Sequence, residues 1–169
     1  NFPPESEIAV TKKAVSEQED AGALKPGDVF TAEGLLYPLL IESSNDAAEA
    51  FAGSVGREKF MAMMNAEVEE LGMGNTFFAN PSGLDESVFG GGTGYSTAAD
   101  LVKMAKFIKS NYPEIFDTLS IGARDLYADR HKFHHRMQST NELLSDKNWP
   151  VEILGGKPGE QTKTKQALL

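Results

Sequence analysis

The sequence predicts a mixed α/β (α+β) fold in a single domain. Apolar residues recur at helical spacing over much of residues 31–116, strand candidates stand near both ends, and loops rich in glycine and proline separate these elements. The 169 residues suffice for one sizeable core, because a chain of this length typically buries about 70% of its unfolded surface. With 40% hydrophobic and 24% charged residues, the composition is that of an ordinary globular protein.

The first elements follow from short-range signals. Residues 7–10 are expected to form a short strand, and the Lys-Pro-Gly-Asp sequence at 25–28 is typical of a turn. Thr31 can cap a helix whose leucines recur at helical spacing, although Pro38 is expected to disturb its backbone. A polar break at residues 43–46 separates this helix from a second apolar helical stripe.

Two further helices are predicted. The third spans about residues 58–71 and ends at Gly72. Its expected buried face consists of Phe60, Met63, Met64, Val68 and Leu71. The fourth begins where Thr97 can accept a first-turn N–H and Asp100 suits the positive end of the helix dipole. Its expected buried face consists of Leu101, Met104, Ala105 and Ile108.

The remaining residues carry weaker signals. Residues 75–94 contain Asn-Pro, Ser-Gly and a glycine run, and are predicted to be loop. A short turn of helix is expected through Phe116, followed by a hairpin or loop over residues 118–150. Residues 151–154 are a strand candidate that leads into Gly155-Gly156-Lys157-Pro158-Gly159.

Charge and composition exclude several functions. A formal net charge of −9 opposes binding to phosphate backbones, so no nucleic-acid partner is expected. Without cysteine the chain can form neither a disulfide nor a thiolate nucleophile. His131, His134 and His135 are interpreted as exposed titrating side chains, and neither a metal nor another cofactor is expected. No apolar run approaches the roughly 20 residues that span a bilayer.

The polar break Ser43-Ser44-Asn45-Asp46 is the first candidate site. A hydroxyl and a carboxamide two residues apart in a tight connection supply one group that relays protons and one that holds a carbonyl. Serine and asparagine are also preferred helix caps, so the same residues could simply begin the next helix. The motif alone leaves both interpretations open.

The glycine-rich segment around Lys157 is the second candidate site. Small residues let backbone and ligand approach closely, and the lysine ammonium supplies positive charge for a carboxylate. It is not a phosphate-binding loop, because Pro158 stands where a serine or threonine should follow the lysine. A glycine-rich turn with a solvated lysine is the alternative.

Five segments in one order resemble the low-molecular-mass penicillin-binding proteins, the serine D-Ala-D-Ala carboxypeptidases. They are residues 36–48 around Ser43-Ser44-Asn45, then 71–77, 80–85, 95–101 and 155–159. The resemblance implies a serine β-lactamase/D,D-peptidase-like fold, in which helices pack against a central antiparallel sheet. It also implies acyl-enzyme chemistry on peptidoglycan stem peptides ending in D-Ala-D-Ala, with β-lactam antibiotics as ligands of the intact protein. An extracytoplasmic location, periplasmic or at the cell surface, is implied too, and any membrane anchor would lie outside this chain.

By the same resemblance, Ser43, Asn45 and Lys157 are the catalytic residues. Ser43 would relay a proton to the leaving D-Ala, Asn45 would hold the peptide carbonyl, and Lys157 would direct positive charge toward the substrate carboxylate. The expected substrate-binding residues are Ser44, Gly159, Glu160, Gln161 and Thr162. The backbone N–H of Glu160 would be one of two oxyanion donors.

Two departures from the family pattern stand out. No serine in the sequence has a lysine three positions later, so the Ser-x-x-Lys motif of the nucleophile is absent. Pro158 replaces the family's threonine and removes a hydroxyl expected to contact the terminal carboxylate.

Residues 1–169 are therefore interpreted as a partial penicillin-binding domain without the Ser-x-x-Lys segment and the last sheet strands, inactive alone. The alternatives are a non-catalytic module that binds peptidoglycan or a partner, a D,D-endopeptidase, a β-lactamase relative, or a site completed by a second chain.

Overall fold

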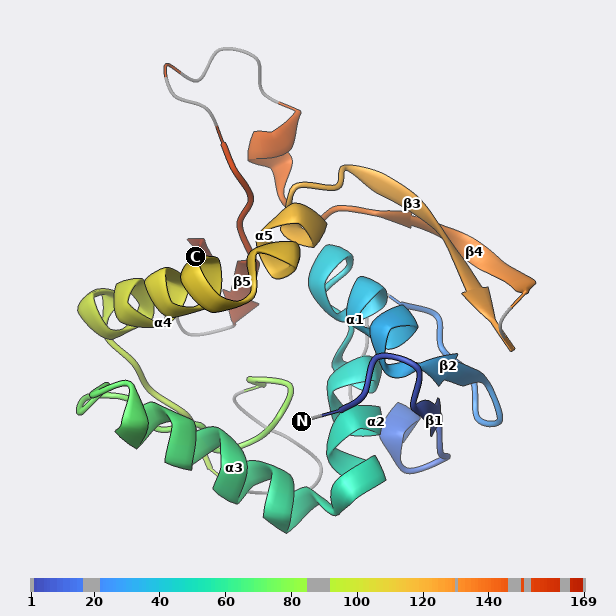
Figure 1. Ribbon diagram of the computed structural model, residues 1–169, viewed down its shortest axis with the longest axis horizontal. Helices are drawn as coiled ribbons and strands as arrows, with labels where there is room; N and C mark the ends of the chain where they lie inside the picture. The colour runs from blue at the N-terminus through green and yellow to red at the C-terminus, as the bar shows by residue number, and fades with distance from the viewer. Residues whose placement is uncertain are drawn as a thin grey trace.

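The computed structural model describes residues 2–16, 22–84, 92–129, 131–145, 150, 153–161 and 165–168. The elements are β1 (Glu7–Ala9), η1 (Ala14–Ser16), β2 (Val29–Thr31), α1 (Ala32–Ile41), α2 (Asn45–Val55), α3 (Arg57–Glu70), α4 (Ala98–Asn111), α5 (Pro113–Leu119), β3 (Ala123–Ala128), β4 (Lys132–Gln138), η2 (Glu142–Leu144), β5 (Pro158–Gln161) and β6 (Lys165–Leu168). Figure 1 shows α1 and α2 with strands β1 to β4 on one side and α3 and α4 on the other. The predicted mixed fold class is confirmed.

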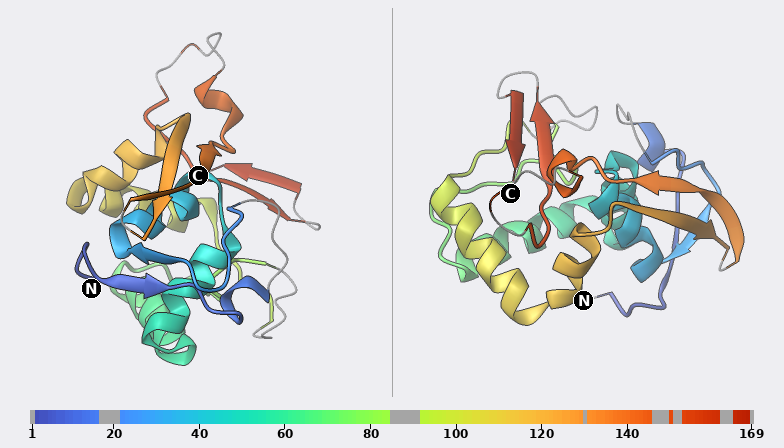
Figure 2. Two further views of the ribbon diagram at one scale, coloured as in Figure 1. Left: turned by 90° about the vertical axis from the view of Figure 1, so that its right-hand side faces the viewer. Right: turned by 90° about the horizontal axis from the view of Figure 1, so that it is seen from above.

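The hydrophobic core lies around α1 and α2. Leu35 on α1 and Ala47 on α2 are completely buried, and Ile41 at the end of α1 is 1% exposed. Other core residues come from the strands: Ile8, Phe30, Leu126, Ala128 and Met137. Two views in Figure 2 show β1 and β2 lying against these helices. The helices that flank the polar break are thus anchored in the hydrophobic core.

Helix α1 begins where its sequence predicts. Thr31 Oγ1 accepts the N–H of Gly34 at 3.0 Å, which caps the first turn. Pro38 does not end the helix, which continues to Ile41. Its carbonyl instead accepts two N–H groups beyond the helix, from Glu42 at 3.2 Å and Ser44 at 3.1 Å. These two bonds fold the chain back at the polar break.

Helices α3 and α4 are confirmed, but their apolar faces are less buried than expected. Val68 is the buried residue of α3, Asp100 is that of α4, and Met63 is 41% exposed. The reason is that the two helices face each other across an apolar cavity of about 280 Å³, which Met64 and Met104 help to line. The side chains that line the cavity, such as Met64 and Met104, therefore contact other residues on one side and the cavity on the other.

Asp100 joins α4 to the loop that follows α3. Thr97 caps the helix as predicted, because its Oγ1 accepts the N–H of Asp100 at 3.2 Å. The Asp100 carboxylate accepts hydrogen bonds from Lys103 Nζ at 2.8 Å, the Asn75 N–H at 2.9 Å and the Thr76 hydroxyl at 3.2 Å. The hydrogen bond from Lys103 is the largest of the effects that lower the pKa of Asp100 below its ordinary value of 3.8.

The described strands form three separate two-stranded antiparallel sheets, β1–β2, β3–β4 and β5–β6. The β3–β4 hairpin confirms one of the two structures expected between residues 118 and 150. The strand predicted at 151–154 is wrong for Ile153 and Leu154, which lie in no strand, while its first two residues are outside the described part. There the chain packs on α5 instead, since a Cβ added at Gly155 would lie 3.0 Å from the Phe116 carbonyl oxygen.

Replacing Asp100 with asparagine should lower the free energy of unfolding at neutral pH. A carboxylate whose folded pKa is lowered stabilises the fold above its unfolded pKa, near 3.8, and that contribution is lost as the pH falls through the folded pKa. The stability difference between wild type and variant should therefore shrink as the pH drops below 3.8. Urea unfolding at neutral and at strongly acidic pH measures it.

The control is Asp117→Asn, which alters an exposed carboxylate on α5. A variant at Asp117 that is destabilised with the same pH dependence would contradict the role of Asp100.

Candidate active site

Ser43 and Lys157, which are 114 positions apart in the sequence, meet in the folded chain. Lys157 Nζ donates a hydrogen bond to Ser43 Oγ and another to the Pro158 carbonyl at 3.1 Å. Ser43 lies between α1 and α2, and Lys157 directly precedes β5. The two motifs singled out in the sequence therefore form one site.

The backbone of Ser43 is left-handed, with φ of +63°. This region costs a residue with a side chain roughly 1–2 kcal/mol, and it persists where the surroundings hold it. Here the N–H groups of Glu42 and Ser44, one on each side, both bond to the Pro38 carbonyl. The fold thus fixes a conformation that the residue would not adopt alone.

The two serines of the polar break have different roles. Ser44 Oγ accepts the N–H of Ala47 at 3.2 Å and caps α2, and this residue is 1% exposed. A Cβ added at Gly22 would lie 2.5 Å from Ser44 Oγ, so the chain covers Ser44 closely. The substrate-binding role expected for Ser44 stays a prediction, and the burial of this residue does not favour it. Asn45 is the first residue of α2 and is half-buried.

The segment before Lys157 is held by two contacts. Gly155, with φ of +148°, packs on α5 in a conformation that favours glycine. Asn141 is 3% exposed; its Nδ2 donates to the Gly156 carbonyl at 3.4 Å, while its Oδ1 accepts the Leu143 N–H at 3.1 Å. Sequence reasoning missed Asn141, because asparagine before a short helix signals only a cap.

Burial lowers the pKa of Lys157 below its ordinary value of 10.5. Removing water from an ammonium group favours the neutral amine, so the proton is held less tightly than in an exposed lysine. A hydroxyl in direct hydrogen-bond contact with such an amine is placed to exchange a proton with it. The pair can therefore act as a proton relay as well as a positive charge.

The other expected substrate-binding residues lie on or beyond β5. Gly159 is exposed and pairs with Ala167, and Glu160 pairs with Gln166. Gln161 ends the strand, and Thr162 lies outside the described residues. Their binding roles stay predictions.

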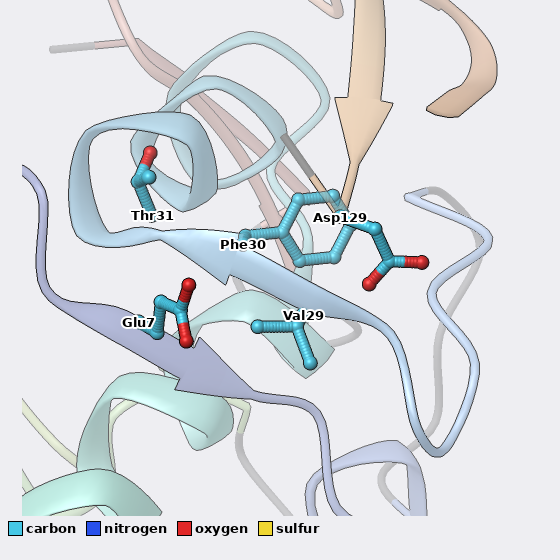
Figure 3. Close-up of a pocket in the computed structure, with 5 residues that line it drawn as sticks. All are labelled: Glu7, Val29, Phe30, Thr31 and Asp129. Atoms are coloured by element: carbon cyan, nitrogen blue, oxygen red, sulfur yellow. The ribbon is translucent and has the colours of Figure 1, made fainter. Parts of the chain in front are cut away.

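A separate pocket of about 290 Å³ lies on β1 and β2 (Figure 3). Its lining residues are Glu7, Val29, Phe30, Thr31 and Asp129. None of them belongs to the Ser43–Lys157 pair, and the two charged ones are carboxylates, which repel a ligand that ends in a carboxylate. This pocket does not suit the ligand expected from the sequence.

Two other properties concern metals and membranes. Across the described residues, no three histidine, aspartate or glutamate side chains gather in a way that could hold a metal ion. His131 is exposed as expected, whereas His134 and His135 are partly buried. None of the described helices combines the length and apolar character needed to cross a bilayer.

Comparison with protein families identifies the chain. A family model described as D-alanyl-D-alanine carboxypeptidase matches residues 3–169. The chain belongs to this family. The resemblance inferred from the five sequence segments is confirmed, and members of this family are serine peptidases.

Individual relatives agree. The chain is 30% identical over 156 residues to a D-alanyl-D-alanine endopeptidase of Haemophilus influenzae, and the match covers 90% of this chain and 50% of the relative. It is 43% identical over 89 residues to the D-alanyl-D-alanine carboxypeptidase DacB2 of Mycobacterium tuberculosis, and this match covers 52% of this chain and 30% of the relative. The chain thus spans half or less of these two proteins.

Solved structures confirm the fold. A D-alanyl-D-alanine carboxypeptidase of Mycobacterium tuberculosis matches with a TM-score of 0.86 at 29% identity, over 99% of this chain and 61% of that chain. A Streptomyces K15 DD-transpeptidase variant matches with a TM-score of 0.78 at 25% identity, over 98% and 66%. The described elements therefore form part of a D,D-peptidase fold.

An NMR titration of the Lys157 side chain should give a pKa below 10.5 in the wild type and also in Ser43→Ala. Burial is the cause of the lowered pKa, so removing the hydroxyl should leave the shift in place. Ser145→Ala, which removes an exposed hydroxyl, serves as the matched control. A return to the ordinary pKa in Ser43→Ala alone would show that the hydroxyl contact, and not burial, sets the value.

Proposed function

We propose that the protein is a serine-type D-Ala-D-Ala peptidase that acts on peptidoglycan stem peptides through an acyl-enzyme intermediate. The observation that carries the proposal is the contact between Ser43 and the partly buried Lys157. Family membership supports the reaction class. The attacking serine would be that of a Ser-x-x-Lys motif, which the 169 residues do not contain.

The proposed roles follow from side-chain chemistry. Cleavage between the two D-Ala residues leaves an amine that needs a proton. Ser43 donates its hydroxyl proton to this amine and regains one from Lys157, whose lowered pKa favours release. The Asn45 amide donates to the peptide carbonyl, and the Glu160 N–H donates to the oxyanion. Such a reaction takes place at the bacterial cell wall, so an extracytoplasmic location belongs to the proposal.

The relatives carry two kinds of activity in their names, carboxypeptidase and endopeptidase. We favour carboxypeptidase activity, because Lys157 supplies positive charge for a terminal carboxylate. Endopeptidase activity is the second candidate, and the match over 90% of this chain to an endopeptidase supports it. Comparing a linear stem peptide with a cross-linked one as substrate separates the two activities.

A non-catalytic module that binds stem peptides is the rival from another class. Two observations motivate it: the absent Ser-x-x-Lys motif and Pro158 in the lysine motif. Such a module would hold the peptide at Lys157 but form no covalent intermediate.

Intact mass spectrometry of the protein isolated from the cells that make it tests the proposal. Incubation with benzylpenicillin should add the mass of one penicillin, because the β-lactam acylates the nucleophilic serine. Ser43→Ala and Lys157→Ala should slow peptide cleavage by about 10²-fold or more, whereas Ser145→Ala should leave the rate unchanged. Absence of both an adduct and D-Ala release would overturn the proposal, and peptide binding without turnover would favour the rival.

Pro158→Thr should raise kcat/KM for a stem peptide with a free terminal carboxylate about tenfold. Threonine restores a hydroxyl that can donate to the carboxylate, and a hydrogen bond to a charged group is worth about 1.5–3 kcal/mol. A peptide with a C-terminal amide serves as the control and should gain much less. Equal gains on both peptides would show that the substitution acts through the backbone of β5.

A further inference from the structure

The β3–β4 hairpin contains a β-bulge at His134. His135 pairs with Leu126 and Phe133 pairs with Tyr127, so His134 has no partner of its own across the ladder. Adjacent residues of a regular strand point to opposite faces, whereas a bulge re-aims a side chain. This is why the rings of two consecutive residues, His134 and His135, meet with Nδ1 atoms 2.6 Å apart.

Both histidines also contact a carboxylate through the other ring nitrogen. His134 Nε2 lies 3.0 Å from Asp28 Oδ2, and His135 Nε2 lies 2.8 Å from Glu42 Oε2. The two histidine side chains are 10% and 22% exposed. The four groups form one continuous chain, Asp28–His134–His135–Glu42, that crosses from the turn before β2 to the end of α1.

Counting ring hydrogens shows how many this chain needs to satisfy all of its contacts. Each Nε2 needs a hydrogen to donate to its carboxylate, and the contact between the two Nδ1 atoms needs one more. That makes three ring hydrogens, whereas two neutral imidazoles carry two. With both carboxylates ionised, all three contacts are satisfied only when the pair has taken up one extra proton. A second extra proton would set two N–H groups against each other.

A shared metal ion does not explain the short contact. Two nitrogens bound to one zinc at about 2.0–2.1 Å each would be about 3.3 Å apart at a tetrahedral angle. The observed 2.6 Å is much shorter than that separation and lies just below the usual range of about 2.7–3.2 Å for N–H hydrogen bonds.

We propose that His134 and His135 are positioning residues for Ser43, which share one added proton and thereby hold Glu42. Glu42 caps α1, immediately precedes the left-handed Ser43, and donates its N–H to the Pro38 carbonyl. Fixing its carboxylate at 2.8 Å from His135 therefore anchors one end of the strained turn. The inference rests on the proposed function only because it treats Ser43 as a catalytic residue.

Each neighbouring element contributes to this environment. The turn at residues 25–28 supplies Asp28, whose carboxylate also accepts the Lys25 N–H at 2.7 Å. The residue that caps the C-terminal end of α1 is Glu42. Strand β2 supplies the Phe30 ring, 5.8 Å from that of His134, and β3 supplies the buried Leu126 opposite His135. Among the described residues, these two carboxylates are the charged groups that hydrogen-bond to the pair. Loss of the shared proton removes one of the three hydrogen bonds, because two neutral rings carry only two hydrogens.

NMR spectroscopy tests the proposal without requiring turnover. The histidine ring nitrogens and the Ser44 amide are followed over about pH 5 to 8, where histidines exchange their proton. The pair should take up one proton, and the Ser44 amide shift should follow the same curve. His135→Gln keeps an N–H donor for Glu42 but cannot titrate, so the pH dependence of the amide should disappear. His135→Ala loses the donor as well, and exchange of the Ser44 amide should accelerate about tenfold.

His131→Gln is the matched control, because His131 is an exposed histidine on the same hairpin. It should change neither the shift nor the exchange rate. A Ser44 amide that ignores the titration, or an equal response to His131→Gln and His135→Gln, would overturn the proposal. Spectral changes on adding Zn²⁺ that a chelator reverses would also overturn it, in favour of a metal site. Because none of these readouts is catalytic, a negative penicillin test would leave them interpretable.

Discussion

The left-handed backbone at Ser43 is the constraint on which the candidate site depends. This conformation lets the chain end α1 and begin α2 within a few residues. As a result, Ser44 caps α2 while Ser43 contacts Lys157. The conformation is costly for serine and needs outside support. Pro38 provides the nearest support, since its carbonyl accepts N–H groups from both sides of Ser43. Pro38, a residue type that ordinarily weakens a helix, thus lies in the last turn of α1, just before the helix ends.

Segments distant in the sequence support the same turn. The Thr140 N–H donates to the Ile41 carbonyl at 3.1 Å, and the next residue, Asn141, contacts the Gly156 carbonyl. Residues 140 and 141 therefore bridge the end of α1 and the segment that carries Lys157. Closing such long loops costs entropy that grows only slowly with length, so a few well-placed contacts can keep the two motifs together. The β-bulge at His134 adds a third support through Glu42.

Sequence patterns predicted the helices well and their environment less well. Caps at Thr31 and Thr97 have local causes and were found. The burial of α3 and α4 was overestimated, because periodicity says which face is apolar but not how closely another element approaches it. The strand expected at 151–154 was wrong for Ile153 and Leu154 because the glycine after them packs on α5. The sequence pattern predicts only a dipole interaction for Asp100, yet its main contacts are to Lys103 and the loop before α4.

The sequence by itself determined the family, the order of the motifs and the identity of Ser43, Asn45 and Lys157 as candidate residues, because these depend on residue type and spacing along the chain. It could not determine which of two adjacent serines caps the helix, that Lys157 contacts Ser43, or that Asn141 and the histidine pair hold the site. Those features depend on which segments meet in space, and contacts across a hundred residues leave no local pattern. Only the tertiary structure decided them, by removing water from Lys157 and by bringing residues 140 and 141 and the histidine pair against the turn that contains Ser43.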